Sequence, residues 1–268
     1  MPYNQQTQET LKQLIFAGKV KEFTTKFNTI LQADHNSAMQ YLNGENDEGR
    51  ALLGWAAMQK KGGELIKYLI AVGADVNHQD GKDRTALSDA IAEGNVSNAR
   101  ILILNGADIS LSDFEGNTPL HIAAEPVENS TQSIKLLCTA GASITATNKQ
   151  GATPLHTAAK HSLEALHAMV TLRKGVIDIN KPDNDGDTPL HYAAMSETGH
   201  NDTYLLMLGA DSTFTNNEGK TAAQVANDWD SEGKDWEAII GFDPDANNNP
   251  EAFYVQVMAD EQASYDYA

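Results

Sequence analysis

The chain has 268 residues, one cysteine, and 19 basic against 37 acidic residues, which gives a formal net charge of −18. Nucleic acids and anionic membranes are held chiefly by Lys and Arg, so this charge disfavours both and favours a protein partner with a basic surface. One cysteine excludes a disulfide framework within the chain. Without a run of 18 apolar residues or an apolar leader, we expect a cytoplasmic, soluble monomer.

The chain begins with two segments in which apolar residues recur at helical spacing, Glu9–Gly18 and Val20–Leu31. A further short helix is expected around Tyr41. We interpret residues 1–45 as a helical amino-terminal cap, or as a degenerate copy of the repeat that follows it.

The tetrapeptide Thr-Pro-Leu-His then occurs three times at intervals of 35 residues, beginning at Thr118, Thr153 and Thr188. Such a fixed period indicates supersecondary units that bury apolar surface by stacking on their neighbours. Weaker copies begin at Ala51, Thr85 and Thr221. They extend the pattern to six repeats, at approximately 46–79, 80–112, 113–147, 148–182, 183–215 and 216–242.

One period predicts two helices. Thr118 is placed to cap a first helix, and Pro119 occupies the first helical position, where its missing N–H costs nothing. A second helix follows from Ser133 and ends at Gly141, the residue type that favours a left-handed helix stop. An Asx-x-x-Gly turn then leads to the next repeat as a short hairpin.

These motifs resemble the ankyrin repeat, which carries the pattern Asx-x-x-Gly-x-Thr-Pro-Leu-His-x-Ala-Ala and a Gly-Ala-Asp close. The resemblance implies an all-α solenoid of stacked helix pairs with short β-hairpin loops. Local departures are Gly54-Trp55 and Ser88-Asp89 where His-x is usual, and a lengthened inter-helix turn at Glu125–Ser130.

The candidate chemical sites have structural explanations. His121, His156 and His191 occupy equivalent places about 10 Å apart, which is too far to share a zinc ion. The resemblance implies that this histidine bonds to backbone in neighbouring hairpins. The acidic turn at Asp183 departs from a calcium loop in the place of its glycine. With no nucleophile elbow or phosphate loop, we expect no catalytic residue, metal or cofactor; the alternative is an enzyme or enzyme-regulatory subunit with a site built on the repeats.

The resemblance implies a partner-binding concave face made of hairpin tips and of the ends of the first helices. The predicted tip residues are Lys82, Arg84, Phe114, Glu115, Asn117, Lys149, Gln150, Asn184, Asp185 and Asp187. The predicted helix-end residues are Glu125, Lys160, His161 and Met195, with Met58 and Glu93 in the first two repeats. Phe114 is the main candidate, because a large aromatic side chain at a tip has little to bury against in its own repeat.

Three further expectations concern single residues and the tail. Cys138 lies on the apolar stripe of a second helix and is expected to be buried. Asn77 and Asn180 resemble positions that asparaginyl hydroxylases modify on ankyrin repeats. Residues 243–268 form a tail whose apolar run at Phe253 is either docked on the last helices or mobile and read by another protein.

The sequence therefore predicts a non-catalytic scaffold or adaptor that binds another protein. Two settings fit it: an endogenous cytoplasmic protein, or a bacterial effector translocated into a host cell. The net charge of −18 has a second explanation of equal weight, which is that it keeps a long exposed stack of repeats soluble and monomeric.

Overall fold

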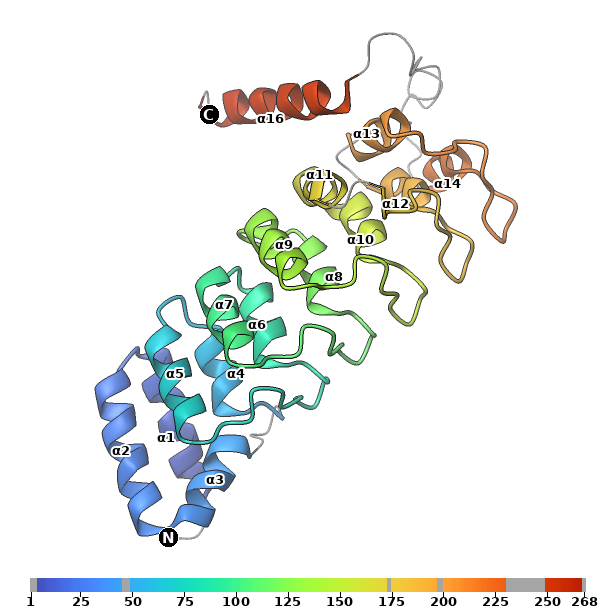
Figure 1. Ribbon diagram of the computed structural model, residues 1–268. Coiled ribbons are helices and arrows are strands. Elements are labelled where there is room, and N and C mark those ends of the chain that lie inside the picture. The colour runs from blue at the N-terminus through green and yellow to red at the C-terminus, as the bar shows by residue number, and fades with distance from the viewer. Residues whose placement is uncertain (1–3, 45–48, 173–174, 197–199, 230–248, 267–268) are drawn as a thin grey trace. The chain divides into compact units, whose positions relative to one another are not determined.

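The computed structural model describes residues 4–44, 49–172, 175–196, 200–229 and 249–266, with only the backbone described at 229 and 260–266. Its regular elements are helices (Figure 1). They are α1 (Gln5–Phe16), α2 (Val20–Ala33), α3 (His35–Asn43), α4 (Leu52–Ala57), α5 (Gly63–Ala71), α6 (Ala86–Ala92), α7 (Val96–Leu104), α8 (Pro119–Ala124), α9 (Ser130–Thr139), α10 (Pro154–His161), α11 (Leu163–Leu172), α12 (Pro189–Ala194), α13 (Asn201–Met207), α14 (Ala222–Trp229) and α16 (Pro250–Asp266).

The ends of the helix pairs follow the predicted signals. At α10, Thr153 is the N-cap, Pro154 begins the helix, and a capping box joins the threonine to His156. The second helices stop where glycine takes a left-handed conformation, as at Gly106 (φ 91°) and Gly141 (φ 97°). These sequence predictions are confirmed.

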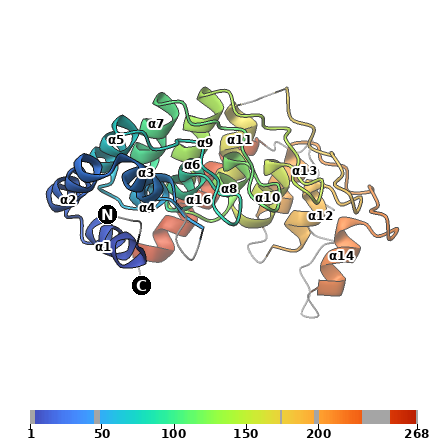
Figure 2. The ribbon, with the colours of Figure 1, turned by 90° about the horizontal axis from the view of Figure 1, so that it is seen from below.

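The chain divides into two compact units, residues 1–123 with 127–143, and residues 124–126 with 144–268. In the first unit, α4 packs on both α5 and α6, and α7 packs on α5, α6 and α9. Figure 2 shows α5 beside α7, and α1 beside α2 at the amino-terminal end. Leu52, Leu87 and Leu102 are fully buried between these layers. Stacking of neighbouring repeats therefore creates the core, as a solenoid requires.

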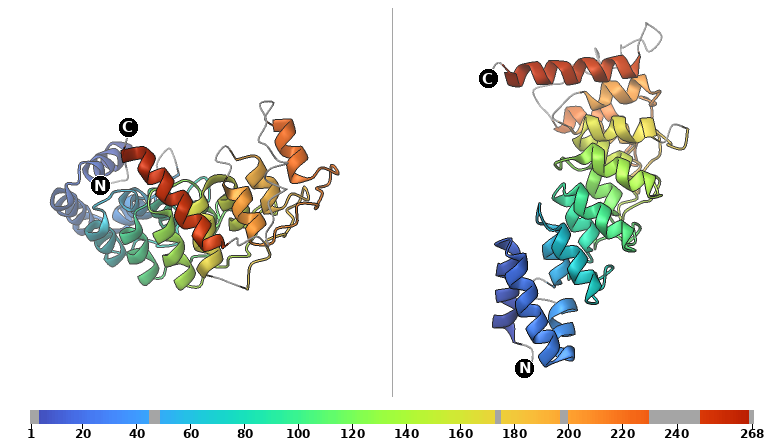
Figure 3. Two further views of the ribbon diagram at one scale, coloured as in Figure 1. Left: turned by 90° about the horizontal axis from the view of Figure 1, so that it is seen from above. Right: turned by 60° about the vertical axis from the view of Figure 1, so that its left-hand side comes forward.

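The amino-terminal helices α1 to α3 also belong to the first unit and appear in blue in Figure 3. Asn4 caps α1 by accepting the Thr7 N–H at 2.7 Å. Phe23 and Phe27 are fully buried, and both meet the Tyr68 ring of α5 edge to face. The α1–α2 pair is thus joined to the repeats through an aromatic cluster.

In the second unit, α12 packs on α10, α13 and α14, and α16 contacts α13. The Tyr254 ring of α16 stacks on His167 of α11, with ring centroids 3.7 Å apart, and Val257 is buried. These contacts favour the docked alternative for the tail. Residues 230–242 of the predicted sixth repeat lie outside the described residues, as do residues 46–48 at the start of the first repeat.

Two smaller findings complete the fold. Cys138 is buried, as predicted. Among the helices that the structure describes, none has both the length and the apolar character needed to cross a bilayer.

Candidate partner-binding surface

Five hairpin tips in the described residues share one hydrogen-bonding pattern. At Asp113, a side-chain oxygen accepts the backbone N–H of Glu115 at 3.0 Å and of Asn117 at 2.8 Å. The Asp113 N–H donates in turn to the Asn117 carbonyl at 3.0 Å. The other four tips repeat this pattern on Asp80, Asn148, Asp183 and Asn216. The Asx side chain thus fixes the tip backbone.

In the first unit, the structure brings two predicted tip residues together. The Phe114 N–H donates to the Lys82 carbonyl at 3.0 Å, which joins adjacent tips. The Phe114 side chain is 48% exposed, and Lys82 and Glu115 are exposed as well. An aromatic ring with a cation and an anion beside it is thereby held on a fixed backbone.

Two other predicted residues of this unit are engaged within their own tips. The Arg84 guanidinium donates twice to one oxygen of Asp80, at 2.9 and 3.1 Å, and is half-buried. The Asn117 amide donates to Glu115 at 3.2 Å. Their side chains help to order the tips in addition to any contact with a partner.

In the second unit, Lys149, Gln150 and Asn184 are exposed and lie on adjacent tips. The Asn184 N–H donates to the Gln150 carbonyl at 2.9 Å, and its side-chain amide donates to the Lys149 carbonyl at 3.0 Å. These three predicted residues are therefore neighbours in this unit, and their role in binding stays a prediction.

The next tip of the second unit is strongly acidic. Asp185 is exposed, and its carbonyl accepts the Asn217 N–H at 2.9 Å. Asp187 is half-buried and accepts the Asn216 side-chain amide at 2.8 Å. Burial raises the pKa of Asp187, and although the Asn216 bond opposes this, the Asp183 and Asp185 carboxylates add to it. This tip would attract a basic group.

The predicted helix-end residues are less uniform than the tips. Glu93 and Glu125 are exposed, whereas Lys160, His161 and Met195 are half-buried. Met58 is half-buried too, and its sulfur lies 3.0 Å from a guanidinium nitrogen of Arg50. Whether the tips and helix ends of both units act as one face stays a prediction.

Two of the three tetrapeptide histidines, His156 and His191, show the expected bond to the backbone of a neighbouring hairpin. His156 Nδ1 accepts the Thr153 N–H at 3.1 Å, so its other ring nitrogen carries the proton and donates to the Asp187 carbonyl at 3.2 Å. His191 likewise donates to the Lys220 carbonyl at 3.0 Å. Each imidazole joins a first helix to the following hairpin, and both are buried. Among the described residues, no group of three His, Cys, Asp or Glu could hold a metal.

A buried charge network in the first two repeats was missed from the sequence. The Arg50 guanidinium lies 3.2 Å from an Asp89 oxygen and 3.6 Å from Asp80, and all three side chains are almost wholly buried. It also lies over the Trp55 ring, 4.7 Å from its centroid. Asp80 also receives the Arg84 pair.

The electrostatics of the two carboxylates differ. Burial raises the pKa of Asp89 to about 7, against the attraction of Arg50 and Arg84. Burial also opposes ionisation of Asp80, but hydrogen bonds from Arg84 and Lys82 outweigh it and lower the Asp80 pKa.

The sequence feature that could have revealed this network is the pair of departures from the repeat pattern, Gly54-Trp55 and Ser88-Asp89. A Cβ atom on Gly54 would lie 2.8 Å from an Asp89 oxygen and 2.9 Å from the Arg50 side chain. The usual histidine is therefore absent because the ion pair fills its space. Asp89 and Trp55, at the next position, supply the partners.

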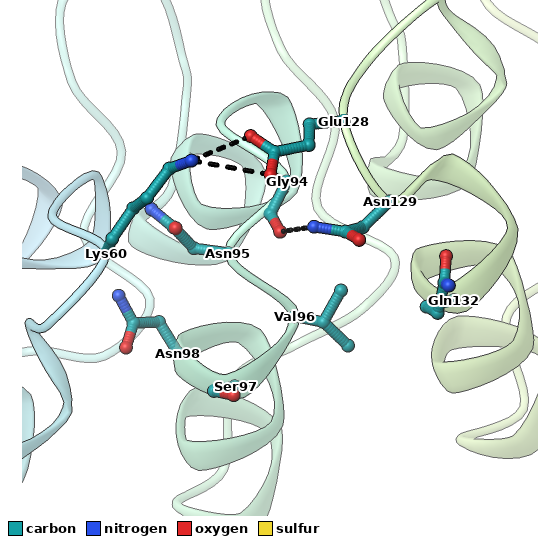
Figure 4. Close-up of a pocket in the computed structure, with 9 residues that line it drawn as sticks. All are labelled: Lys60, Gly94, Asn95, Val96, Ser97, Asn98, Glu128, Asn129 and Gln132. Atoms are coloured by element: carbon teal, nitrogen blue, oxygen red, sulfur yellow. Dashed lines mark hydrogen bonds and ion pairs between the residues drawn. The ribbon is translucent and has the colours of Figure 1, made fainter. Parts of the chain in front are cut away.

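The lengthened turn before α9 closes a polar pocket of about 340 Å³ in the first unit (Figure 4). Glu128 reaches back to Lys60, two repeats away, at 3.0 Å. Asn129 takes a left-handed conformation and its amide donates to the Gly94 carbonyl at 3.0 Å. A Cβ on Gly94 would lie 2.2 Å from the Glu128 carbonyl, so the turn requires glycine there.

The floor of this pocket is made of amide side chains. Asn95 and Asn98 are buried, and each donates two hydrogen bonds to carbonyls at the end of α4. These bonds tie adjacent repeats together and give the pocket a structural role.

The proposed hydroxylation residues carry a comparable structural role. The Asn77 side chain accepts the Asp108 N–H at 2.8 Å and donates to the Gly106 carbonyl at 3.2 Å. Asn180 accepts the Asp211 N–H at 2.8 Å. Both amides bridge successive hairpins, and their modification stays a prediction.

The comparisons with known proteins agree with this geometry. A family model described as ankyrin repeats (3 copies) matches residues 3–113, 53–148 and 120–216. The chain therefore belongs to the ankyrin-repeat family, whose repeats are generally protein–protein interaction modules on a typically non-catalytic fold.

Individual relatives match only in part. The chain is 39% identical over 92 residues to the nuclear factor NF-kappa-B p105 subunit of Gallus gallus, which is 34% of this chain and 9% of that protein. It is 43% identical over 76 residues to the ankyrin repeat and KH domain-containing protein mask-1 of Caenorhabditis elegans, 28% of this chain and 3% of that one. The matches thus span small parts of these relatives.

A solved structure gives a broader match in fold. The ankyrin repeat domain of Bcl-3, described as a member of the IkappaB protein family, superposes with a TM-score of 0.66 over 81% of this chain and 92% of that one. The sequences are 23% identical, so the likeness concerns the fold alone.

Proposed function

We propose that the chain is a non-catalytic scaffold or adaptor that binds another protein through its hairpin tips and the ends of its first helices. The observation that carries this proposal is Phe114, a residue that is 48% exposed on a tip held to its neighbour by the Phe114–Lys82 backbone bond. A rigid, exposed aromatic side chain binds with little loss of conformational entropy.

A basic partner surface fits the chemistry of the second unit. Asp183, Asp185 and Asp187 lie on one tip, and the chain as a whole carries a net charge of −18. Complementary charge steers association and fixes the orientation of the partner. The exposed Lys149 on an adjacent tip would pair with a carboxylate of the same partner.

The experiment has two steps. Affinity purification with mass spectrometry names partners, and calorimetry with each purified partner then compares Phe114→Ala and Lys149→Glu with the parent chain. We expect each change to weaken binding about tenfold or more.

Matched controls separate the tips from other surfaces. Leu104, on α7 and 78% exposed, offers Leu104→Ala as the apolar control, and the exposed Lys67 of α5 offers Lys67→Glu as the charge control. Equal loss in the controls, or no loss in the tip variants, would refute the proposal.

The biological setting is a separate proposal with its own test. An endogenous cytoplasmic adaptor and an effector translocated into a host cell both fit a binding stack. Deleting the last 20 or so residues would abolish export of an effector, while leaving an endogenous adaptor in its own cytoplasm.

A further inference from the structure

Charge is unevenly distributed along the chain. The first 33 residues carry four lysines and two glutamates, whereas the whole chain has 19 basic and 37 acidic residues, so the remainder has 15 basic and 35 acidic. These four lysines belong to α1, α2 and the turn between them. The amino-terminal helix pair is therefore locally cationic within a strongly acidic protein.

The surface of this pair is hollowed into a groove of about 600 Å³, which we call the α1–α2 groove. Figures 1 and 2 show the two helices side by side. The groove is lined by Thr10, Leu14, Lys21, Glu22, Thr25 and Lys26. Leu14 and Thr10 are half-buried and form its floor, while the α2 residues are exposed and form its rim.

The rim has an uncompensated positive charge. Glu22 lies 3.1 Å from Lys19 and is neutralised by it. Lys21 and Lys26 are exposed, and their side-chain ammonium groups make no ion pair or hydrogen bond with any described residue. The amino end of α2 has no side-chain cap, so the helix dipole adds a positive potential at the same end.

We propose that the α1–α2 groove is a docking site for an acidic amphipathic helix of another protein. Leu14 and the methyl groups of Thr10 and Thr25 would contact its apolar stripe. Lys21 and Lys26 would pair with carboxylates that flank the stripe. This is the helix-in-groove mode of recognition, with charge setting the choice of partner.

This site is independent of the hairpin tips and prefers the opposite charge. The tips of the second unit favour a basic group, whereas the groove favours an acidic helix. A chain with both surfaces can bring two oppositely charged proteins together, so the scaffold would have a defined polarity.

The test uses the full chain, labelled with ¹⁵N, and two synthetic amphipathic peptides of about 18 residues, long enough for five helical turns. One carries glutamates beside a leucine stripe, and the other carries lysines in their place. We expect the glutamate peptide to bind, to shift amide signals of α1 and α2, and to bind more weakly at high salt.

Variants then locate the site. The double change Lys21→Glu with Lys26→Glu is expected to lower the affinity for the glutamate peptide about tenfold. Lys61→Glu with Lys67→Glu makes the same change of charge on exposed residues outside the groove, and should alter affinity less than about twofold. Leu14→Gln should also weaken binding, with circular dichroism checking that the variant stays folded.

Several results would overturn the proposal. These are equal binding of the lysine peptide, signal shifts confined to the hairpin tips, or equal loss in the control pair. Phosphatidylserine vesicles or duplex DNA that bind through Lys21 and Lys26 more tightly than the glutamate peptide would also overturn it, because they would make the groove a site for a different class of ligand.

Discussion

In the repeats of His156 and His191, a neutral imidazole joins each first helix to the following hairpin, whereas in the repeat of Arg50 a buried guanidinium meets Asp80 and Asp89 of the next repeat. Both links cross a repeat boundary, and both are almost wholly buried. The imidazole satisfies polar groups without a buried charge. The guanidinium must be matched by carboxylates, because desolvating an isolated ion is costly.

The boundary between adjacent repeats can therefore be joined by either of two side-chain chemistries, and they differ in how much stability is lost when one is removed. Removing a hydrogen-bonded imidazole lowers the stability of the protein by a modest amount. Removing one partner of a buried ion pair lowers it more, because the remaining partner is left charged in a site that excludes water.

The largest expected effect comes from removing the central cation. Arg50→Ala leaves the buried Asp89 carboxylate without its adjacent counter-ion, whereas Asp80 keeps Arg84, and the change should lower the free energy of unfolding by about 3–5 kcal/mol. Urea unfolding followed by circular dichroism measures this. The double change Arg50→Met with Asp89→Leu replaces the pair by apolar groups and should recover most of the loss; failure to recover would mean that packing, not charge, dominates.

The imidazole link should be weaker. His191→Ala removes its bonds to Thr188 and Lys220 and should cost about 2–3 kcal/mol, since buried groups on both sides lose a partner. The same urea experiment checks this. His161→Ala, at a half-buried histidine of the same unit, should cost less than about 0.5 kcal/mol. If His191→Ala lowered the free energy of unfolding as much as Arg50→Ala does, the proposed difference between the two links would be wrong.

The stability contributed by the buried ion-pair link should depend on pH, because Asp89 titrates with a raised pKa. The Asp89 pKa is raised by burial to about 7 from 3.8, so between pH 7 and 4 the folded chain binds a proton that the unfolded chain does not. The Asp89 contribution to stability must therefore rise as pH falls through this range, on the order of 1–3 kcal/mol. The measurement is the difference in unfolding free energy between the parent and Asp89→Asn at pH 7.5 and about pH 5. A difference that does not change with pH would show that Arg50 keeps Asp89 ionised.

Breaking an exposed ion pair should cause the smallest loss of stability, against which the losses at the buried links can be compared. Lys60 and Glu128 are 3.0 Å apart, but their side chains are 75% and 60% exposed. Lys60→Ala should lower stability by about 0–1 kcal/mol, and high salt should erase the difference. A loss that persists in high salt would show that Lys60 supports the turn through packing.

The regular repeats could be predicted from the sequence because their signals are local. Thr153, Pro154 and His156 lie within four residues, and Gly141 ends its helix by its own backbone preference. The tips were also predictable, because an Asx residue organises the four residues that follow it. The register of the repeats also places Phe114 at a tip, which is why its exposure could be predicted.

The irregular parts were harder because their partners are distant in the chain. Gly54 and Asp89 depart visibly from the repeat pattern, but no local pattern predicts that the Arg50 side chain lies against Gly54 and pairs with Asp89. The reach of Glu128 to Lys60 spans 68 residues. The stacking of Tyr254 on His167 likewise depends on which helix face meets α16.

The family, the register of the repeats and the residues at each tip could be predicted from the sequence alone, because a fixed period and local capping chemistry recur along the chain. Which charges are buried and paired, and which stay exposed beside a groove, as Lys21 and Lys26 do, follows only from the folded arrangement of the helices. Burial and pairing depend on the neighbours that a side chain meets in space. Stacking sets those neighbours across repeats, beyond the range of any local pattern.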